Sequence, residues 1–249
     1  MSELRQQGQF WDSVTAAVQP IAEARALVEA LLPVEHIRGG MVLDAGCGAG
    51  DYTAALWQIG ARGVCSFDVS VGSMRVARAK SPQGRFAQAS LSELPFPDAT
   101  FEAVWVWGVL HYVPMPTVAV REIVRVLKPN GTAVIHTLRR GLWSSAELAA
   151  AQVLSRAPRG VEAAILAAGE RLIPLVSRAI TGKRPDEQTS KTIRQKLHER
   201  LFVPGKLTTF SVGTLAEAAR GMAVVTEVQA PVSDLLNRNM SLTVMVRKQ

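Results

Sequence analysis

The sequence predicts an α/β fold in which helices alternate with the strands of a mainly parallel sheet. Short apolar runs of strand length recur from residue 41 to residue 138, and segments with helical spacing of apolar residues separate them. A glycine-rich turn follows the first apolar run directly. This alternation is typical of βαβ units, whose strands pair in parallel.

The first expected strand, Met41–Ala45, continues into Gly46-Cys47-Gly48-Ala49-Gly50 and then into a helical stretch over residues 51–58. A strand, a glycine-rich turn and a helix in this order bring bare backbone and a helix N-terminus close to a bound ligand. The spacing departs from the dinucleotide fingerprint G-x-G-x-x-G, because Asp51 stands where the third glycine belongs. The carboxylate of Asp44, two residues before the turn, favours a ligand with a cationic amino group over a pyrophosphate.

The second expected strand, residues 63–68, also ends in a carboxylate, Asp68, which can accept hydrogen bonds from both hydroxyl groups of a ribose. A third strand over residues 85–89 is followed by Ser90. Ligands of parallel α/β sheets bind beyond the carboxyl ends of the strands. The side chains of Asp44, Asp68 and Ser90 are therefore expected at one edge of the sheet.

The remaining elements follow from the same alternation of patterns. Apolar residues at helical intervals around Pro20 predict two helices within residues 10–32. The other expected elements are helices over 72–80, 117–127 and 212–220, a turn at 129–131, and strands over 101–107, 132–138, 223–229 and 242–247.

Taken together, the motifs resemble those of class I S-adenosylmethionine-dependent methyltransferases, in particular the type 11 group similar to enzymes of ubiquinone and menaquinone biosynthesis. The resemblance covers about residues 40 to 138. The residues that carry it are Val42 to Gly50, Asp68-Val69-Ser70 with Met74 and Ala77, Leu94 to Asp98 with Phe101, and Arg121-Glu122 leading to Val126–Gly131. It implies a Rossmann-like, seven-stranded, mostly parallel sheet with helices on both faces and an antiparallel last strand.

The resemblance also implies S-adenosylmethionine as the cofactor, with S-adenosylhomocysteine as its product. The cofactor-binding residues that it implies are Asp44, Gly46, Cys47, Gly48, Gly50, Asp68, Val69, Ser90, Leu91 and Trp107. Asp44 would orient the methionine portion and Asp68 would hold the ribose. Where the family usually has an Asp that bonds the adenine amino group, this chain has Ser90, which accepts without charge; the difference is about 1 kcal/mol.

Two residues after the fourth strand are candidate catalytic groups, since in the family this loop lies beside the transferred methyl group. They are His111 and Tyr112. Histidine is the side chain whose unperturbed pKa suits proton transfer near neutral pH, so His111 is a candidate general base. Shaping of the acceptor site or packing are the alternative roles for both.

Three regions are expected along the chain. Residues 40–140 and 206–249 form the S-adenosylmethionine-binding domain, and residues 141–205 form a helical, basic cap insertion after the fifth strand. Residues 1–39 form N-terminal helices. Two interpretations of these helices remain open: packing on the core, or a lid over the cofactor, as in related enzymes.

The net charge of +7 is confined to one stretch of the chain. Residues 139–206 contain 13 Arg and Lys against 6 Asp and Glu, whereas the rest of the chain is neutral. An acidic acceptor, an acidic carrier protein and a solvated helical surface all agree with this charge. In the insertion only Trp143 and Phe202 are aromatic, which argues against stacking on single-stranded nucleic acid and leaves tRNA modification as a weaker option.

Composition excludes several other classes. The chain has 249 residues, 48% hydrophobic and 20% charged, as is ordinary for a folded globular protein. Arg, Lys, Glu or Pro interrupts every apolar run before it reaches membrane-spanning length, and the N-terminus has no signal-peptide pattern, so a cytoplasmic location is expected. Cys47 and Cys65 are expected to be small buried residues, and the four histidines lack metal-ligand spacing, so no metal site is predicted.

The sequence thus predicts an enzyme that transfers a methyl group to O, N or C of a small-molecule acceptor, in keeping with secondary metabolism. One alternative is a methyltransferase of tRNA or protein that uses the basic insertion. Another is a protein that binds the cofactor without methyl transfer. The sequence identifies neither the acceptor nor the oligomeric state.

Overall fold

The structure, a computed structural model, describes residues 8–12, 19–141, 168, 207–231 and 241–249. The chain divides into two compact units, Met1–Ser144 with Leu207–Gln249, and Ser145–Lys206. All described residues except residue 168 belong to the first unit. The cap insertion predicted for residues 141–205 lies outside the described residues apart from positions 141 and 168.

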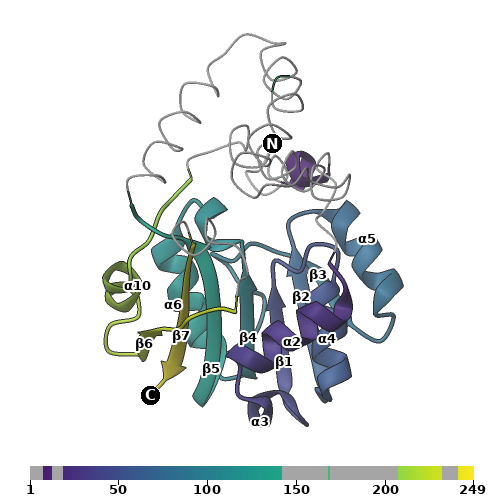
Figure 1. Cartoon of the computed structure of the whole chain (residues 1–249), viewed down its shortest axis with the longest axis horizontal. Coiled ribbons are helices and arrows are strands. Elements are labelled where there is room, and N and C mark those ends of the chain that lie inside the picture. The colour runs from purple at the N-terminus through teal and green to yellow at the C-terminus, as the bar shows by residue number, and fades with distance from the viewer. Residues whose placement is uncertain (1–7, 13–18, 142–167, 169–206, 232–240) are drawn as a thin grey trace, which may run out of the picture. The chain divides into compact units, whose positions relative to one another are not determined.

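Among the described residues, the first unit is built around a seven-stranded sheet with the strand order β3-β2-β1-β4-β5-β7-β6 (Figure 1). Strands β1 to β5 pair in parallel, and β7 is antiparallel to both β5 and β6. The strands are β1 (Met41–Ala45), β2 (Gly63–Asp68), β3 (Arg85–Gln88), β4 (Phe101–Trp107), β5 (Leu127–Leu138), β6 (Ala223–Glu227) and β7 (Ser241–Lys248). The prediction of a seven-stranded, mostly parallel sheet is confirmed.

Helices cover both faces of this sheet (Figure 1). The helices are α2 (Ile21–Leu31), α3 (Val34–Ile37), α4 (Asp51–Ile59), α5 (Val71–Lys80), the 3-10 helix η1 (Leu110–Tyr112), α6 (Pro116–Val126) and α10 (Val212–Ala218). Helices α2 and α4 pack on one face, and α6 and α10 pack on the other. The two layers explain why the central strands β1 and β4 are almost entirely buried, as is usual for parallel strands.

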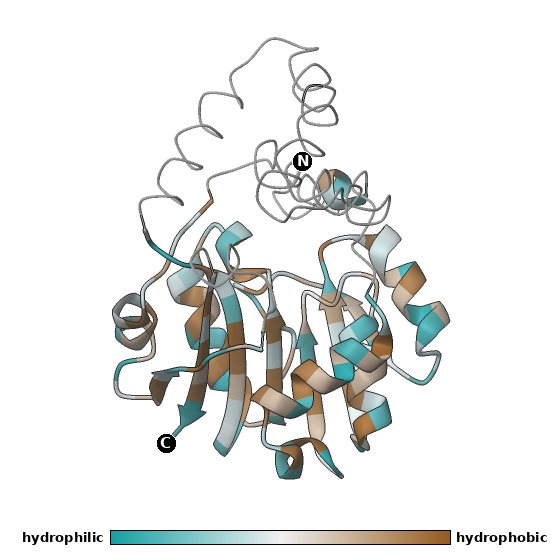
Figure 2. Cartoon of the chain, in the orientation of Figure 1, coloured by the Kyte–Doolittle hydropathy of each residue, from teal (hydrophilic) through white to brown (hydrophobic). Residues whose placement is uncertain are grey.

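The core follows the alternation of side chains along each strand. On the face of α2 and α4, Val42 and Trp105 pack with Leu56. On the opposite face, Leu43 packs in a cluster with Ile123 of α6 and residues of α10. Figure 2 shows the same division, with hydrophobic residues along the central strands and hydrophilic residues on outward-facing parts of the helices. Both faces are therefore closed, and the edge formed by the strand ends is left for ligands.

The strand order places a crevice at that edge. Strand β1 lies between β2 and β4, so the connections from β1 and β4 leave the sheet in opposite directions. In open α/β sheets, this reversal of strand order separates the loops at the carboxyl ends and creates a ligand-binding crevice. The loop after β1 is the glycine-rich turn, which the strand order places at this point.

Two local predictions differ from the structure. The turn predicted at residues 129–131 lies within β5, where the pairing passes from Phe101↔Leu127 to Ala103↔Thr132 and leaves a bulge. Asn130 there has φ 63, the left-handed conformation that Asn tolerates. The chain therefore turns locally at Asn130, as predicted, but strand β5 continues to pair with β4 before and after this turn. The four-residue helix α3 was not predicted.

Candidate active site

Asp44, near the end of β1, is a buried carboxylate held by the hydroxyl group of Thr53. Its side chain is on the face of α4, where Thr53 Oγ1 donates to Asp44 Oδ2 at 2.6 Å and lies 2.9 Å from Ser66 Oγ. Burial raises the pKa of Asp44 to about 7; the Thr53 hydrogen bond opposes this shift and the Asp68 charge adds to it. Among the described residues, no Arg or Lys side chain pairs with Asp44. A cationic ligand group would supply the missing counter-charge.

Asp68, at the end of β2, joins the glycine-rich turn to the start of α5. Its Oδ2 accepts from the backbone N–H of Gly48 at 2.8 Å, and its Oδ1 accepts from that of Ser70 at 2.9 Å. Burial raises the pKa of Asp68, and the backbone hydrogen bonds from Ser70 and Gly48 counteract that rise. Each carboxylate oxygen has a second lone pair, so both can still accept from ligand hydroxyls.

The glycine-rich turn leaves room for a ligand at one position and excludes side chains at another. A methyl group on Gly46, which has φ 75, would collide with the side chain of Val109 from the loop after β4. A methyl group on Gly48, which has φ 49, would meet no atom of the described residues within 4 Å. The turn therefore packs against the β4 loop at Gly46 and faces open space at Gly48.

Cys47 takes part in this turn through its backbone. Its N–H and that of Gly46 both donate to Phe67 O at 2.9 Å, which ties the turn to β2. Its side chain is buried against Met74 and Ala77 of α5. Burial, with the nearby carboxylates, raises the pKa of this thiol, which keeps it protonated. The prediction that Cys47 is a small buried residue is confirmed, and so is that for Cys65.

The residues expected to contact adenine follow β3. Ser90 is half-buried, and its Oγ accepts from the Ser92 N–H at 3.3 Å. The side chain of Leu91 is only 3% exposed and belongs to the core, so its backbone is the part available to a ligand. Arg125 of α6 holds the following loop by donating to the carbonyls of Phe96 at 2.8 Å and Leu94 at 3.1 Å, and Glu122 of the same helix accepts from the Leu94 N–H at 2.9 Å. This clamp keeps the segment after β3 in place.

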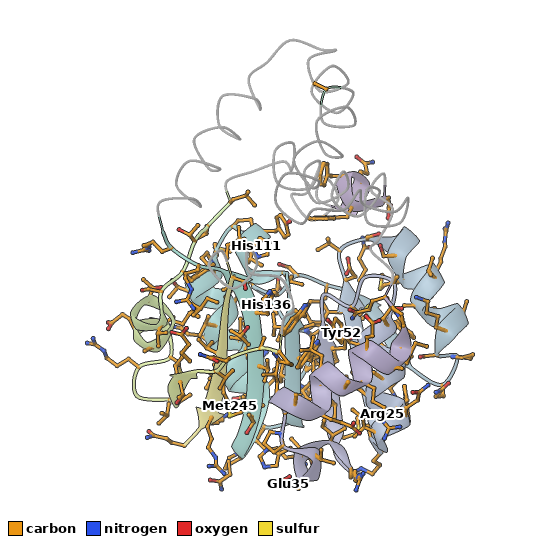
Figure 3. All side chains as sticks on the ribbon, in the orientation of Figure 1. Arg25, Glu35, Tyr52, His111, His136 and Met245 are labelled. Atoms are coloured by element: carbon orange, nitrogen blue, oxygen red, sulfur yellow. The ribbon has the colours of Figure 1, made fainter. Side chains whose placement is uncertain are left out.

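His111 and Tyr112 lie in η1, directly after β4. His111 is 6% exposed, its Nδ1 is 3.4 Å from Thr137 Oγ1 of β5, and its carbonyl accepts from the Thr208 N–H at 3.0 Å. The Tyr112 ring packs against the His111 ring with centroids 4.1 Å apart. Figure 3 shows His111 at the end of the sheet opposite Glu35 of α3. The two candidate catalytic residues therefore lie together at the carboxyl ends of β4 and β5.

Trp107, predicted to contact the cofactor, ends β4 within a group of aromatic rings. Its ring stacks on Trp105 with centroids 5.0 Å apart and on His136 of β5 with centroids 4.0 Å apart. Tyr52 of α4 packs against both tryptophans. The labelled His136 and Tyr52 lie near this end of the sheet in Figure 3. The group brings Tyr52 and His136 into contact with Trp107.

The described N-terminal residues 8–12 contact two of these loops. Asp12 Oδ1 accepts from Ser70 Oγ at 2.7 Å and from the Gly72 N–H at 2.8 Å, at the start of α5. The Trp11 ring meets the Tyr112 ring edge to face, with centroids 4.8 Å apart. This segment therefore connects the loop after Asp68 with the loop that contains His111 and Tyr112.

Several residues of the site escaped the sequence reasoning. Thr53 and Ser66 support Asp44 from α4 and β2. A serine inside the otherwise apolar run of β2 is a signal that could have been used for Ser66. For Asp12 no local signal exists, because its partner Ser70 is 58 residues further along the chain.

The residues at this edge fit S-adenosylmethionine. Asp44 is a buried carboxylate without a cationic partner among the described residues, and the cofactor carries an ammonium group. Gly48 borders open space, and the Asp68 carboxylate lies beside it. The fold and these residues define a Rossmann-like domain of the class I methyltransferase type.

Comparison with known proteins agrees. A family profile described as a methyltransferase domain matches residues 43–135. The malonyl-[acyl-carrier protein] O-methyltransferase of Erwinia pyrifoliae is 31% identical over 61% of each chain, and the 27-O-demethylrifamycin SV methyltransferase of Amycolatopsis mediterranei is 32% identical over 49% of this chain and 47% of its own. A crystal structure of an S-adenosylmethionine-dependent methyltransferase from Mesorhizobium loti superposes with a TM-score of 0.56 at 22% identity, covering 92% of this chain and all (100%) of the other, which shows the fold.

Residues 43–135 therefore form a methyltransferase domain similar to those of class I S-adenosylmethionine-dependent methyltransferases, including enzymes of menaquinone and ubiquinone biosynthesis. The chain spans 61% or less of the length of the first curated relatives that it matches. No helix in the described ranges is long and apolar enough to cross a membrane.

Proposed function

We propose that this protein transfers the methyl group of S-adenosylmethionine to an O, N or C nucleophile of a small molecule in secondary metabolism. The observation that carries the proposal is the buried Asp44 carboxylate at the end of β1, beside a glycine-rich turn that borders open space at Gly48. Two relatives named for their acceptors, a malonyl-[acyl-carrier protein] and a demethylrifamycin, support an acceptor outside nucleic acid.

Each residue of the site has a role in this proposal. The bound cofactor supplies a methyl group already activated by its sulfonium charge. Asp44 would hold the ammonium group of the methionine portion, and Asp68 would accept from the ribose hydroxyls. Ser90 and the Leu91 backbone would contact adenine. Because the methyl group is already activated, the protein contributes mainly by positioning the acceptor in line with it.

His111 would take the proton that an O–H or N–H acceptor loses. Its ring is buried beside Tyr112 and near Thr137 Oγ1, so its orientation is restricted. General bases of this kind contribute about 10²-fold to 10⁴-fold in rate. Replacing His111 with Asn should lower turnover by about 10²-fold and remove the acidic limb of the pH–rate profile. Unchanged turnover with an unchanged profile would leave His111 with a packing role.

Cofactor binding and methyl transfer require separate tests. Calorimetry should show binding of S-adenosylmethionine to the wild type, and Asp44→Ala should weaken it by at least about tenfold through loss of the ion pair. Transfer is then followed with radiolabelled cofactor and pools of small hydroxylated, amino and carboxylic compounds. Binding without transfer to any pool would favour the alternative of a cofactor-binding protein, and absent binding would refute both.

We also propose that the acceptor is acidic, and this proposal is based on the sequence alone. The 13 Arg and Lys in residues 139–206 exceed the 6 Asp and Glu there, which would favour an anionic acceptor or an acidic carrier protein. The same charge would serve a tRNA or protein substrate. Sensitivity to salt distinguishes these, because macromolecular polyanions bind through many charges at once.

A further inference from the structure

The connection between β3 and β4, residues 89–100, contains no helix and no strand. It begins with the segment proposed to contact adenine, Ser90 and Leu91. Because a connection of this kind cannot pair its backbone polar groups within a helix or a ladder, other parts of the molecule must supply the partners. Helix α6 supplies several of them: Arg125 and Glu122 bond the middle of the connection, and carbonyls at the end of α6 accept from its last two N–H groups.

The middle of the connection is held at Leu94. Arg125 donates to the Leu94 carbonyl at 3.1 Å and to the Phe96 carbonyl at 2.8 Å, and Glu122 accepts from the Leu94 N–H at 2.9 Å. The Leu94 side chain is only 5% exposed and belongs to the core between the sheet and α6. Both backbone polar groups of Leu94 are therefore bonded to one pair of side chains, and its own side chain is fixed by packing.

The Arg125–Glu122 pair is itself rigid. Arg125 Nε and Nη2 donate to the two carboxylate oxygens of Glu122 at 2.7 and 2.8 Å, a bidentate contact. Together with its bonds to the two carbonyls and to Asp98, all five N–H groups of the guanidinium are used. The Asp98 side chain is 76% exposed, so its bond contributes least, whereas those of Arg125 and Glu122 are 29% and 19% exposed.

A tight turn connects this fixed point with the proposed adenine contacts. The Glu93 N–H donates to the Ser90 carbonyl at 3.1 Å, and the Ser92 N–H donates to Ser90 Oγ at 3.3 Å. On the other side, the Ala89 N–H donates to the Asp68 carbonyl at the end of β2 at 3.3 Å. Residues 90 and 91 therefore lie between one fixed point on β2 and another on α6.

The backbone amide of Leu91 is available to a ligand. Among the described residues, no atom accepts a hydrogen bond from its N–H. Such a donor can bond the N1 atom of adenine, which is an acceptor, but not the N1 atom of hypoxanthine, which carries a hydrogen. This discrimination depends on the position of the amide, because a hydrogen bond weakens steeply when its distance or angle departs from the ordinary range.

We propose that Arg125 and Glu122 are positioning residues that make the cofactor site selective for adenine by fixing the segment of Ser90 and Leu91. This rests on the proposed function, which it deepens by naming residues that determine the specificity of the site for the base. The two side chains act through the backbone of Leu94 rather than by touching the cofactor. Without them, three backbone groups of the connection lose their partners, and the Leu91 amide is free to shift.

The test compares S-adenosylhomocysteine with S-inosylhomocysteine, which differ only in the base. Their affinities for each protein are measured by calorimetry. The wild type should bind the adenine compound at least about tenfold more tightly, the scale of an unmet hydrogen bond in a buried site. The ratio of the two affinities does not depend on the folded fraction of the sample, so a role in stability alone would not change it. Equal affinities in the wild type would overturn the inference, whereas failure to bind either compound would refute the proposed function.

Variants assign the selectivity to the pair. Arg125→Lys keeps the charge but cannot hold Glu122 and both carbonyls at once, so the ratio should fall to about twofold or less. Glu122→Gln removes the charge of the bidentate contact and should lower the ratio at least about threefold. The matched control is Arg121→Lys in the same helix, because the Arg121 side chain is exposed and has no bonded partner among the described residues; it should keep the wild-type ratio.

Two results would overturn the inference: a wild-type ratio in Arg125→Lys, or a lowered ratio in Arg121→Lys. If Arg125→Lys does not fold, Glu122→Gln decides by the same criterion. Thermal unfolding of each variant, measured alongside, separates lost stability from lost selectivity.

Discussion

We propose that ligand binding and folding stability oppose each other at Asp44. Its carboxylate is buried beneath the glycine-rich turn, and hydroxyl groups, rather than cations, are its described partners. A charge without a counter-charge is costly to bury, so the folded protein favours the protonated form. The bound cofactor would reverse that preference by placing an ammonium group beside it. In this proposal, the burial of Asp44 destabilises the free protein and favours binding of a cationic ligand.

We predict that Asp44→Asn stabilises the free protein at neutral and higher pH. The pKa of Asp44 is about 7 in the folded chain and 3.8 for an unperturbed Asp, so between these values the folded state binds more protons than the unfolded state. The contribution of Asp44 to stability therefore falls as pH rises from 3.8 to about 7 and is constant above that. Asn can still accept the Thr53 hydrogen bond, and the expected gain at about pH 8 is on the order of 2–4 kcal/mol.

Chemical denaturation of the wild type and Asp44→Asn at several pH values measures this gain. The difference between them should shrink towards acid, where the wild-type carboxyl group is protonated in both states. Asp44→Asn should bind the cofactor more weakly than the wild type, because Asn offers no charge to an ammonium group. If the wild type and Asp44→Asn were equally stable at about pH 8, burial of the Asp44 carboxylate would not destabilise the folded protein.

At the scale of elements, the glycine-rich turn has one glycine at a close helix contact and another that borders open space. Gly50 has φ 81, and a methyl group there would lie 2.6 Å from Ala77 Cβ of α5. Gly48 has φ 49 and borders open space. Gly50 therefore allows α4 and α5 to approach each other, and we propose that Gly48 leaves room for the cofactor.

Two alanine substitutions distinguish the effect of each glycine on stability from its effect on cofactor binding. Gly50→Ala should destabilise the protein by about 3 kcal/mol, since it adds both backbone strain and a collision with α5. Gly48→Ala should cost about 1 kcal/mol from backbone strain alone and weaken S-adenosylmethionine binding by more than about tenfold. Thermal unfolding and calorimetry measure the two effects. Unchanged cofactor affinity in Gly48→Ala would mean that the ligand lies elsewhere.

The N-terminal segment of residues 8–12 behaves as an element that links two loops. We propose that it closes over the cofactor, because Asp12 bonds the start of α5 and Trp11 contacts Tyr112 beyond β4. Asp12→Ala removes two accepted hydrogen bonds, and the release of S-adenosylmethionine should become about fivefold faster. Glu35→Ala, a change of an exposed acid in α3 at the opposite end of the sheet, is the control. Release at the wild-type rate in Asp12→Ala would leave the segment with a packing role.

Local patterns predicted some elements closely and others poorly. The bounds of β1 and β4 were predicted without error, because each is a mainly apolar run, interrupted by one acidic residue, that ends at a turn signal. The bulge at residues 129–131 depends on pairing with β4, which no local pattern contains. The same holds for the site: Asp44 and Asp68 follow from strand ends, whereas the contact between Trp107 and His136 depends on the register between two strands.

At the scale of the whole molecule, residues 139–206 differ from the rest of the chain in net charge. The 15 Arg and Lys outside residues 139–206 are balanced by 15 Asp and Glu, so the chain outside this stretch has no net charge. A field that attracts an anionic partner would therefore come from residues 139–206. If the acceptor is a small molecule held in a closed site, this field affects binding weakly, because few ions are displaced.

We therefore predict a weak salt dependence of methyl transfer. Between about 50 mM and about 300 mM salt, the KM for a small acceptor should change by less than about twofold, because screening acts mainly on exposed charges. A polyanionic acceptor that displaces several counterions would show a rise in KM of more than about tenfold over the same range. The cofactor affinity, measured at the same salt concentrations, separates screening at Asp44 from screening at the acceptor. A steep response confined to the acceptor would refute the small-molecule proposal and favour an RNA or an acidic protein as the substrate.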